Sequence, residues 1–329
     1  GFIPSVTRDA TADRVAKNQT VRSFVTPANA AAGDIVPSMT NPDAADQTIS
    51  NVAITIEEER FAPFSWTGEE EYAVDQGPGF LNIRQDQIAQ AIRVLVNEIE
   101  TDIYEAATSG VSRAVGTSGT EPFDTNLADS ANVRAILDDN GAPLNSRSLV
   151  INTVAGAKLR TLTTLVNVAD AGTSMTLRDG ELLNIHGFSV KESSQVTDVT
   201  SGTASGPYQI NLVAGYTAGD TSLVVDGGSG TILAGDIVTI GTIKYGVKTG
   251  IAAAGTLVIN EPGLQETVAD NTSVAVNAIS PRNIALSQNA IVLATRIPVA
   301  PLDGDQAIGR EVVTDPRTGI SFEFVKWPG

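Results

Sequence analysis

Few side chains in this sequence could perform acid–base chemistry, and they are scattered. His186 is the single histidine, and as a general base it would need Ser193 or Asp198 close by. Such catalysis requires a partner within hydrogen-bond reach, and no other feature of the sequence converges on this residue. We therefore interpret His186 as a partly buried histidine satisfied by the backbone, with the catalytic role as the alternative.

Two groups of acidic residues could hold a cation. The first is Glu98, Glu100, Asp102 and Glu105, and the second is the Asp-Gly-Asp at 303–305. A calcium loop needs more oxygen ligands, ending in a glutamate at its twelfth position, and no histidine accompanies the first group. We interpret the first group as a solvated helix face and the second as a surface turn.

No glycine-rich segment has the pattern of a catalytic or phosphate-binding motif. The sequence holds no G-x-S-x-G and no G-x-x-x-x-G-K-[ST]. The run DGGSG at 226–230 lies between two expected strands, and we interpret it as a hairpin turn. A carboxylate pair of the glycosidase kind stays open in so acidic a chain, although aromatic residues are only 5%.

Charge and composition exclude several classes. The chain has 329 residues, a net charge of −17 and no cysteine, which excludes disulfides and thiolate metal sites. Lys and Arg form no cluster, so tight binding of nucleic acid through phosphates is not expected. No apolar run approaches the ~20 residues of a membrane span, and no signal peptide is visible, although residues can precede Gly1.

The first part of the chain predicts extended, exposed structure. Residues 1–47 lack sustained periodicity but carry spaced apolar residues, which favours an arm that lies on a neighbouring subunit; a short helical turn could occur within 8–23. Residues 48–67 alternate like strands, first at 52–56 and again at 62–66. A lone two-stranded hairpin is marginal in water, so this excursion needs a partner surface.

Helices and strands then alternate. The clearest helix covers 82–108, with Asn82 as its cap, Gly110 after its end, and one apolar face formed by Ile88, Ile92, Leu95, Ile99 and Ile103. A second helix follows from 127, with Ala131, Val133, Ile136 and Leu137 inside. A strand at 148–152 leads into a helix near Thr153, and two strand pieces surround Gly187. The alternation predicts a mixed α/β domain.

A glycine-rich β segment interrupts that domain. Residues 202–278 hold short strands about every ten residues, separated by glycine-containing turns, which is typical of a small barrel or sandwich. Insertion of a domain is tolerated when both of its ends emerge at one place. The apolar stretch 283–298, NIALSQNAIVLATRIP, is predicted to be a helix that returns into the interrupted core.

This order of elements resembles the major capsid proteins of tailed bacteriophages, whose shell fold is of the Hong Kong 97 type. The likeness is greatest to podovirus coat proteins that carry an inserted β-barrel domain. The segments that carry it are NQTVRS at 18–23, GDIVPSMTNPDAADQTISNVAITI at 33–56, RFAPFSWTGEEE at 60–71, GFSVKESSQV at 187–196, LAGDIVTIGTIKYGV at 233–247, and PRNIALSQNAIVLATRIP at 281–298. One departure is Ser287-Gln288, where coat proteins of this group often have His-Arg.

The resemblance implies an α+β fold of the Hong Kong 97 type with six parts. They are an N-terminal arm (1–47), an extended β-hairpin loop (48–80), a peripheral domain (81–135) with a spine helix (82–108), a first part of the axial domain (136–201), an inserted β-barrel domain (202–278) and an axial and peripheral return (279–329). It also implies pentamers and hexamers that close into an icosahedral shell around double-stranded DNA in the virion. Assembly would take place in the bacterial cytoplasm, with scaffolding and portal proteins as partners and a decoration protein as a further one. No catalysis, cofactor or membrane contact is expected.

Contacts between copies would involve the arm and the hairpin loop, because a single copy leaves their apolar and charged residues uncovered. The candidates are Phe2, Phe24, Glu57, Glu58, Glu59, Arg60, Phe64, Trp66, Glu69, Glu70, Glu71, Arg84 and Arg93. Arg113 and Arg134 are further basic partners for the acidic clusters. The alternative function is a secreted carbohydrate-active or surface protein with a β-rich module, which leaves the first 80 residues without a purpose.

Overall fold

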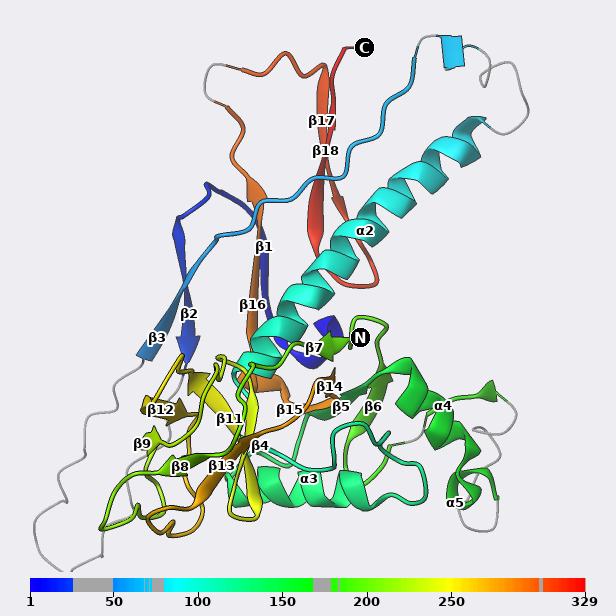
Figure 1. Ribbon diagram of the computed structural model, residues 1–329. Helices are drawn as coiled ribbons and strands as arrows, with labels where there is room; N and C mark the ends of the chain where they lie inside the picture. Colours follow the sequence, from blue (N-terminus) through cyan, green and yellow to red (C-terminus); the bar gives the residue numbers. More distant parts are fainter. Residues whose placement is uncertain are drawn as a thin grey trace, which may run out of the picture. The chain divides into compact units, whose positions relative to one another are not determined.

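The computed structural model describes residues 1–25, 50–67, 69–70, 72, 80–167, 179–182, 184–301 and 304–328. The chain divides into two compact units. Unit 1 comprises Gly1–Thr7 and Val96–Ile291, and unit 2 comprises Arg8–Leu95 and Val292–Gly329. The fold is of the mixed α and β type that the sequence predicts (Figure 1).

Unit 1 is built on a three-stranded sheet whose central strand is completely buried. The sheet has the order β15 (Ile284–Ser287), β5 (Arg147–Ile151), β6 (Ser189–Glu192), with β15 antiparallel and β6 parallel to β5. Parallel strands need a crossover, and α4 (Thr153–Thr161) and α5 (Thr163–Val166) lie within it. Asn152 caps α4 by accepting a hydrogen bond from the N–H of Ala155 at 2.8 Å.

Two further helices complete this part of unit 1. The helix α3 (Ala128–Asp139) ends before Gly141, which has a positive φ. The long helix α2 (Phe80–Ser109) stops one residue before Gly110, and its last turns bury Ile103, Tyr104 and Ala107. A short 3-10 helix η1 (Ile3–Ser5) lies near the start of the chain.

The inserted segment forms a closed antiparallel barrel. Its strands are β8 (Tyr208–Ile210), β9 (Ser222–Asp226), β10 (Ile237–Ile240), β11 (Ile243–Thr249), β12 (Gly255–Ile259) and β13 (Ser273–Val276). The sheet order is β10-β13-β8-β9-β12-β11, and β10 also pairs with β11, which closes the ring. Alternate residues such as Leu223 and Val225 point inward and join a core with Tyr208, Tyr245 and Leu257. The prediction of recurring short strands in 202–278 is confirmed.

Both ends of the insertion lie together, as expected for an inserted domain. The strand β7 (Asp198–Val199) precedes the barrel and pairs with β14 (Ser280–Pro281), which follows it. On another side, β4 (Arg113–Ala114) pairs with β11. The amide of Asn260 in the barrel donates to the carbonyls of Ser109 and Val111 at the end of α2, both at 2.9 Å. These contacts fix the barrel within unit 1.

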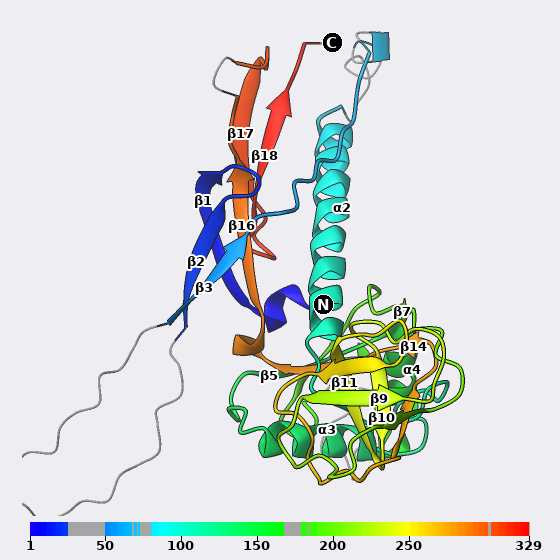
Figure 2. The same cartoon turned by 60° about the vertical axis from the view of Figure 1, so that its left-hand side comes forward.

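Unit 2 is made of separate two-stranded pieces (Figures 1 and 2). One pairs β1 (Thr7–Val15) with β16 (Val292–Pro298), and the second pairs β2 (Thr20–Val25) with β3 (Ser50–Thr55). The third is a hairpin of β17 (Gly309–Thr314) and β18 (Ser321–Lys326). The first half of α2 also belongs to unit 2.

The prediction of a helix at 283–298 is wrong. This stretch forms β15, a short 3-10 helix η2 (Gln288–Ala290) and β16. Ile284, Leu286 and Ser287 are buried, and Ala285 is half-buried. The apolar residues of this stretch fit the spacing of a helix and of a strand. Pairing with β5 selects the strand, because Ile284 lies opposite Val150, which is more than 130 residues away in the sequence.

Four smaller expectations are also wrong. Residues 8–23 form strands instead of a helical turn, and 62–66 have no regular secondary structure; the partner of β3 is β2. The glycines at 226–230 do not close a hairpin, because β9 pairs with β8 and β12. Ala131 on α3 is exposed. The six-part division of the chain stays a prediction.

Candidate assembly surface

Apolar side chains are buried in unit 1 and uncovered in unit 2. Among the described residues, every fully buried hydrophobic side chain except Ile297 and Ile320 belongs to unit 1. Unit 2 is the smaller unit, yet it carries more than half of the exposed large hydrophobic side chains. These are Phe24, Val52, Phe61, Phe64, Tyr72, Ile83, Val94, Val299, Ile308, Val312 and Trp327. An isolated exposed apolar residue is ordinary, but a set of this size in a unit without its own core is a candidate contact surface.

The β2–β3 ribbon is the plainest case. Its ladder runs from Thr20 opposite Thr55 to Val25 opposite Ser50, and in the described chain neither strand pairs with a third. Phe24 is 79% exposed and Val52 48%. Unpaired N–H and C=O groups along both edges can accept another strand. A ribbon of two strands is not stable alone in water, so it needs a covering surface.

The segment after β3 is extended and acidic. Glu57, Glu58 and Glu59 are all exposed, and Arg60 pairs with Glu58 at 2.9 Å within the same segment. Phe61 is 84% exposed. Three adjacent carboxylates repel one another and attract cations, which makes this stretch suited to a basic partner.

The far end of the same segment is tied to its own unit. The ring of Phe64 stacks on Phe324 of β18 with a centroid separation of 6.1 Å, and Trp66 donates to Gln87 of α2. Thr67 and Glu70 form a reciprocal cap, in which the N–H of Thr67 donates to the Glu70 carboxylate and the N–H of Glu70 donates to the Thr67 hydroxyl. The N–H of Thr67 lowers the pKa of Glu70.

The other predicted contact residues have mixed outcomes. Glu69 and Arg93 are exposed, while Glu71 and the side chain of Arg84 lie outside the described residues. Phe2 is not a surface residue, since it is fully buried against Tyr104 in unit 1, with ring centroids 5.7 Å apart. The contact role of the exposed residues stays a prediction.

The two further basic candidates are engaged within their own chain. The Arg113 side chain is 8% exposed and pairs with Asp139 at 3.4 Å, while it donates to the carbonyl of Ile136. Arg134 pairs with Asp138 and donates to the carbonyl of His186. The Arg113 side chain is therefore buried in its own chain, whereas the Arg134 side chain is 43% exposed and its contact role stays a prediction.

Glu100 is not on a solvated helix face. It is 8% exposed, and its carboxylate accepts hydrogen bonds from the N–H groups of Phe2 at 2.7 Å and Ile3 at 2.9 Å and from the hydroxyl of Ser193 at 3.1 Å. The amine of Lys191 donates to the carbonyl of Pro4, and burial lowers the pKa of this amine. Together these groups anchor the first residues to α2 and β6. The helix pattern contained no signal for this, because the partners lie about a hundred residues away.

His186 contacts a serine, but not one that the sequence indicated. Its Nδ1 lies 2.9 Å from Oγ of Ser130, which is itself buried. The Ser130 hydroxyl already donates its single proton to the carbonyl of Leu127 at 2.8 Å, so the imidazole must be the donor. A histidine that donates to serine cannot remove its proton. His186 is exposed rather than partly buried, and the contact holds the 185–188 turn against α3.

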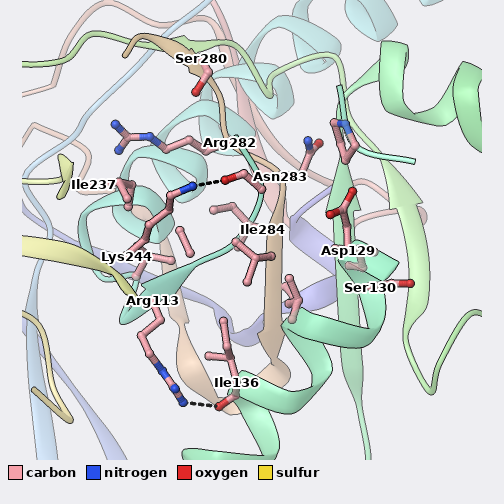
Figure 3. A pocket seen from close by; sticks show the side chains of 18 of the residues that line it. Arg113, Asp129, Ser130, Ile136, Ile237, Lys244, Ser280, Arg282, Asn283 and Ile284 are labelled. Carbon is pink, nitrogen blue, oxygen red and sulfur yellow. Dashed lines mark hydrogen bonds between the residues drawn. The ribbon is translucent and has the colours of Figure 1, made fainter. Parts of the chain in front are cut away.

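A cavity of about 850 Å³ lies in unit 1 between α3, the loop before it and the chain at 280–291. Figure 3 shows Ile136 and Ile284 on its wall, with Arg113 reaching to the Ile136 carbonyl. Two of its lining side chains, Arg113 and Glu121, each have one buried polar atom without a hydrogen-bond partner. Phe123 is its one aromatic lining residue.

The described residues contain no group of three or more His, Asp or Glu side chains that could hold a metal ion. Asp305 pairs with Arg310 and accepts from the N–H of Ala307. Asp303 lies outside the described residues, so the surface turn at 303–305 stays a prediction. No described helix is long and apolar enough to cross a membrane.

Solved structures resemble this chain, but no protein related in sequence was found among family models or curated proteins. No family model and no curated protein matches the chain. A structure described as Mycobacterium phage Che8 is 15% identical, with a TM-score of 0.39 over 75% of this chain and 83% of that chain. The capsid of the cyanophage P-SCSP1u is 14% identical, with a TM-score of 0.42 over 89% and 87%. The mature capsid of bacteriophage PhiM1 is 12% identical, with a TM-score of 0.38 over 90% and 87%. TM-scores this low do not by themselves establish a common fold.

Proposed function

We propose that this chain is the major capsid protein of a tailed bacteriophage. In this role, copies assemble as pentamers and hexamers into an icosahedral shell of the Hong Kong 97 type that encloses double-stranded DNA in the virion. The observation that carries the proposal is unit 2, which has apolar ribbons and almost no core of its own. Neighbouring copies would supply the missing cover, and the order of segments along the sequence supports the same family.

Charge is consistent with a container for DNA. The net charge of −17 and the absence of a Lys and Arg cluster disfavour adhesion to phosphates. Packaged DNA would therefore stay free to move inside the shell. Scaffolding, portal and decoration proteins are the partners that such a role implies.

The carbohydrate-active alternative gains no support from the cavity. Carbohydrate sites commonly use aromatic platforms, and among the described residues that line this cavity Phe123 is the only aromatic one. Both tryptophans, Trp66 and Trp327, belong to unit 2.

Size and shape of the purified protein test the proposal. A sizing column followed by negative-stain electron microscopy should show closed shells, tubes or sheets of regular hexamers. The double variant Phe24→Ser/Phe61→Ser should reduce assembly, because it removes two of the most exposed aromatic rings in unit 2. Leu144→Ser, at an exposed site in unit 1, is the matched control and should assemble normally. A chain that stays small, even when co-expressed with the scaffolding protein of its own genome, would refute the capsid role.

A further inference from the structure

The β17–β18 hairpin is attached to the rest of unit 2 by charged groups as well as by the stack of Phe324 on Phe64. The hairpin is a separate sheet and shares no hydrogen-bond ladder with β1 or β16 in the described chain, although β18 runs beside β16. Ile320 is its one fully buried apolar side chain. Apart from Ile320 and the Phe64–Phe324 stack, polar groups must hold the hairpin in place.

Glu323 of β18 supplies that attachment. Its side chain is only 6% exposed and lies between two guanidinium groups. Arg14 of β1 contacts both carboxylate oxygens, with Nη1 at 3.2 Å from Oε2. Arg310 of β17 donates to Oε2 at 3.1 Å. We call Arg14, Glu323 and Arg310 the Glu323 cluster.

The surrounding charges extend the cluster. Arg14 also donates to the carbonyl of Pro298 at 2.8 Å, which ties the end of β16 to the same carboxylate. Arg310 pairs with Asp305. On the other side of β1, Arg296 of β16 pairs with Asp9 at 2.9 Å, and Arg8 donates to the carbonyl of Thr318 in the hairpin turn. Three of the chain's segments therefore meet at one buried anion.

We propose that the Glu323 cluster is a charge-operated switch, which holds the hairpin on β1 when Glu323 is ionised and releases it when that charge is lost. Loss of that charge removes the anion that both guanidinium groups contact. The Arg14 and Arg310 side chains are 38% and 25% exposed, so they can turn to water, and the ion-paired tie between β1 and β18 is then lost. The hairpin should therefore separate. Unit 1 contains no member of the cluster and should keep its fold. The inference stands independently of the capsid role, which concerns many copies rather than one.

The direction of the pH effect follows from the geometry. The hydrogen bond from Arg14 lowers the pKa of Glu323, with burial opposing it and Arg310 adding to it. A carboxyl whose pKa is lowered in the folded state stabilises that state above the unfolded value, about 4.3 for glutamate. This stabilisation is lost as pH falls through the folded pKa. The hairpin should therefore stay attached from neutral pH down to about 4.3 and be released below it.

Hydrogen exchange measured by mass spectrometry on the full-length chain tests the switch. Glu323→Gln keeps the side-chain shape and removes the charge, and amides of 309–326 should exchange about ten- to hundredfold faster at neutral pH. Barrel peptides from 222–259 should be unchanged. Glu311→Gln removes one charge from an exposed position on the same hairpin and is the matched control, with exchange like that of the wild type.

A pH series and a second variant make the test decisive. After correction for intrinsic rates, wild-type exchange in 309–326 should rise on acidification below pH ~4, while Glu323→Gln should start high and change little. Arg14→Lys keeps the charge but loses the two-pronged contact, so it should give an intermediate rate. Equal exchange of Glu323→Gln and Glu311→Gln would overturn the inference, and so would faster exchange spread evenly over both units.

Discussion

Unit 1 and unit 2 come from one chain but are stabilised in different ways. The barrel of unit 1 encloses its own core, with Tyr208, Leu223 and Leu257 fully buried. Unit 2 buries Ile297 and Ile320 fully and relies on ion pairs such as Arg14–Glu323 and Arg296–Asp9. The difference suggests that unit 1 is stable by itself, while unit 2 is completed by contacts outside the single chain.

The two tryptophans allow this comparison to be measured. Trp66 and Trp327 both lie in unit 2, whereas Tyr104, Tyr208, Tyr216 and Tyr245 lie in unit 1. Tryptophan fluorescence therefore reports unit 2, and exchange of barrel amides reports unit 1. Denaturant should affect the tryptophan signal first, and coincident transitions would contradict independent units.

The largest effect is expected from a cavity in the barrel. Leu257→Ala removes a fully buried side chain and should lower the free energy of unfolding of unit 1 by about 3–5 kcal/mol. Exchange of barrel amides should accelerate, while tryptophan fluorescence of unit 2 should change little. Leu233→Ala is the control, because that side chain is 42% exposed, and it should cost under about 1 kcal/mol. Equal losses from the two variants would argue against a closed core.

A smaller effect is expected where the barrel meets the end of α2. A Cβ at Gly246 would lie 2.0 Å from the carbonyl oxygen of Val111, so Gly246→Ala must displace backbone and should cost about 1–3 kcal/mol. Gly255→Ala on the neighbouring strand meets nothing closer than 3.7 Å and should be tolerated. Thermal unfolding followed by tyrosine circular dichroism would distinguish them. Tolerance of Gly246→Ala would mean that the barrel is not fixed to this segment.

Loss of a helix cap should cost less again. Asn152→Ala removes the acceptor for the N–H of Ala155 and should destabilise unit 1 by about 1 kcal/mol. Asn152→Ser retains a capping oxygen and should recover most of that loss. Urea denaturation monitored by exchange of 153–161 would measure both, and an unchanged alanine variant would show that the cap is dispensable.

Substitutions in the acidic segment Glu57–Glu59 should have the smallest effect on the stability of the single chain. Their effect on assembly should be the largest. Lysine in place of Glu57, Glu58 and Glu59, which are exposed, should leave the free energy of unfolding within about 0.5 kcal/mol. The same change should hinder assembly, because it would place cations where a basic partner is expected. Normal particles by electron microscopy would exclude a role for this segment in contacts between copies.

The spacing of apolar residues predicted those helices and strands whose stabilising contacts come from residues nearby in the sequence. The apolar face of α2 and the alternation of β9 through β13 are visible because neighbouring turns or strands share one surface. The inserted position of the barrel was predicted from the change in composition at 202–278, and the strands on either side of the barrel, β7 and β14, pair with each other. The end of α2 before Gly110 was equally local, whereas Asn82, which was expected to cap this helix, lies inside it, because α2 begins at Phe80.

Tertiary structure decided the features that depend on distant partners. Ile284–Ser287 and Val292–Pro298 are strands because β5 and β1 pair with them, although the apolar composition of the stretch alone fits a helix equally well. Glu100 binds the start of the chain, and Glu323 meets Arg14 across 309 positions. Sequence by itself determined which segments are apolar, acidic or glycine-rich. Which charge is buried, and beside what, was decided only when folding brought the strands together, because burial and pairing are properties of position in space.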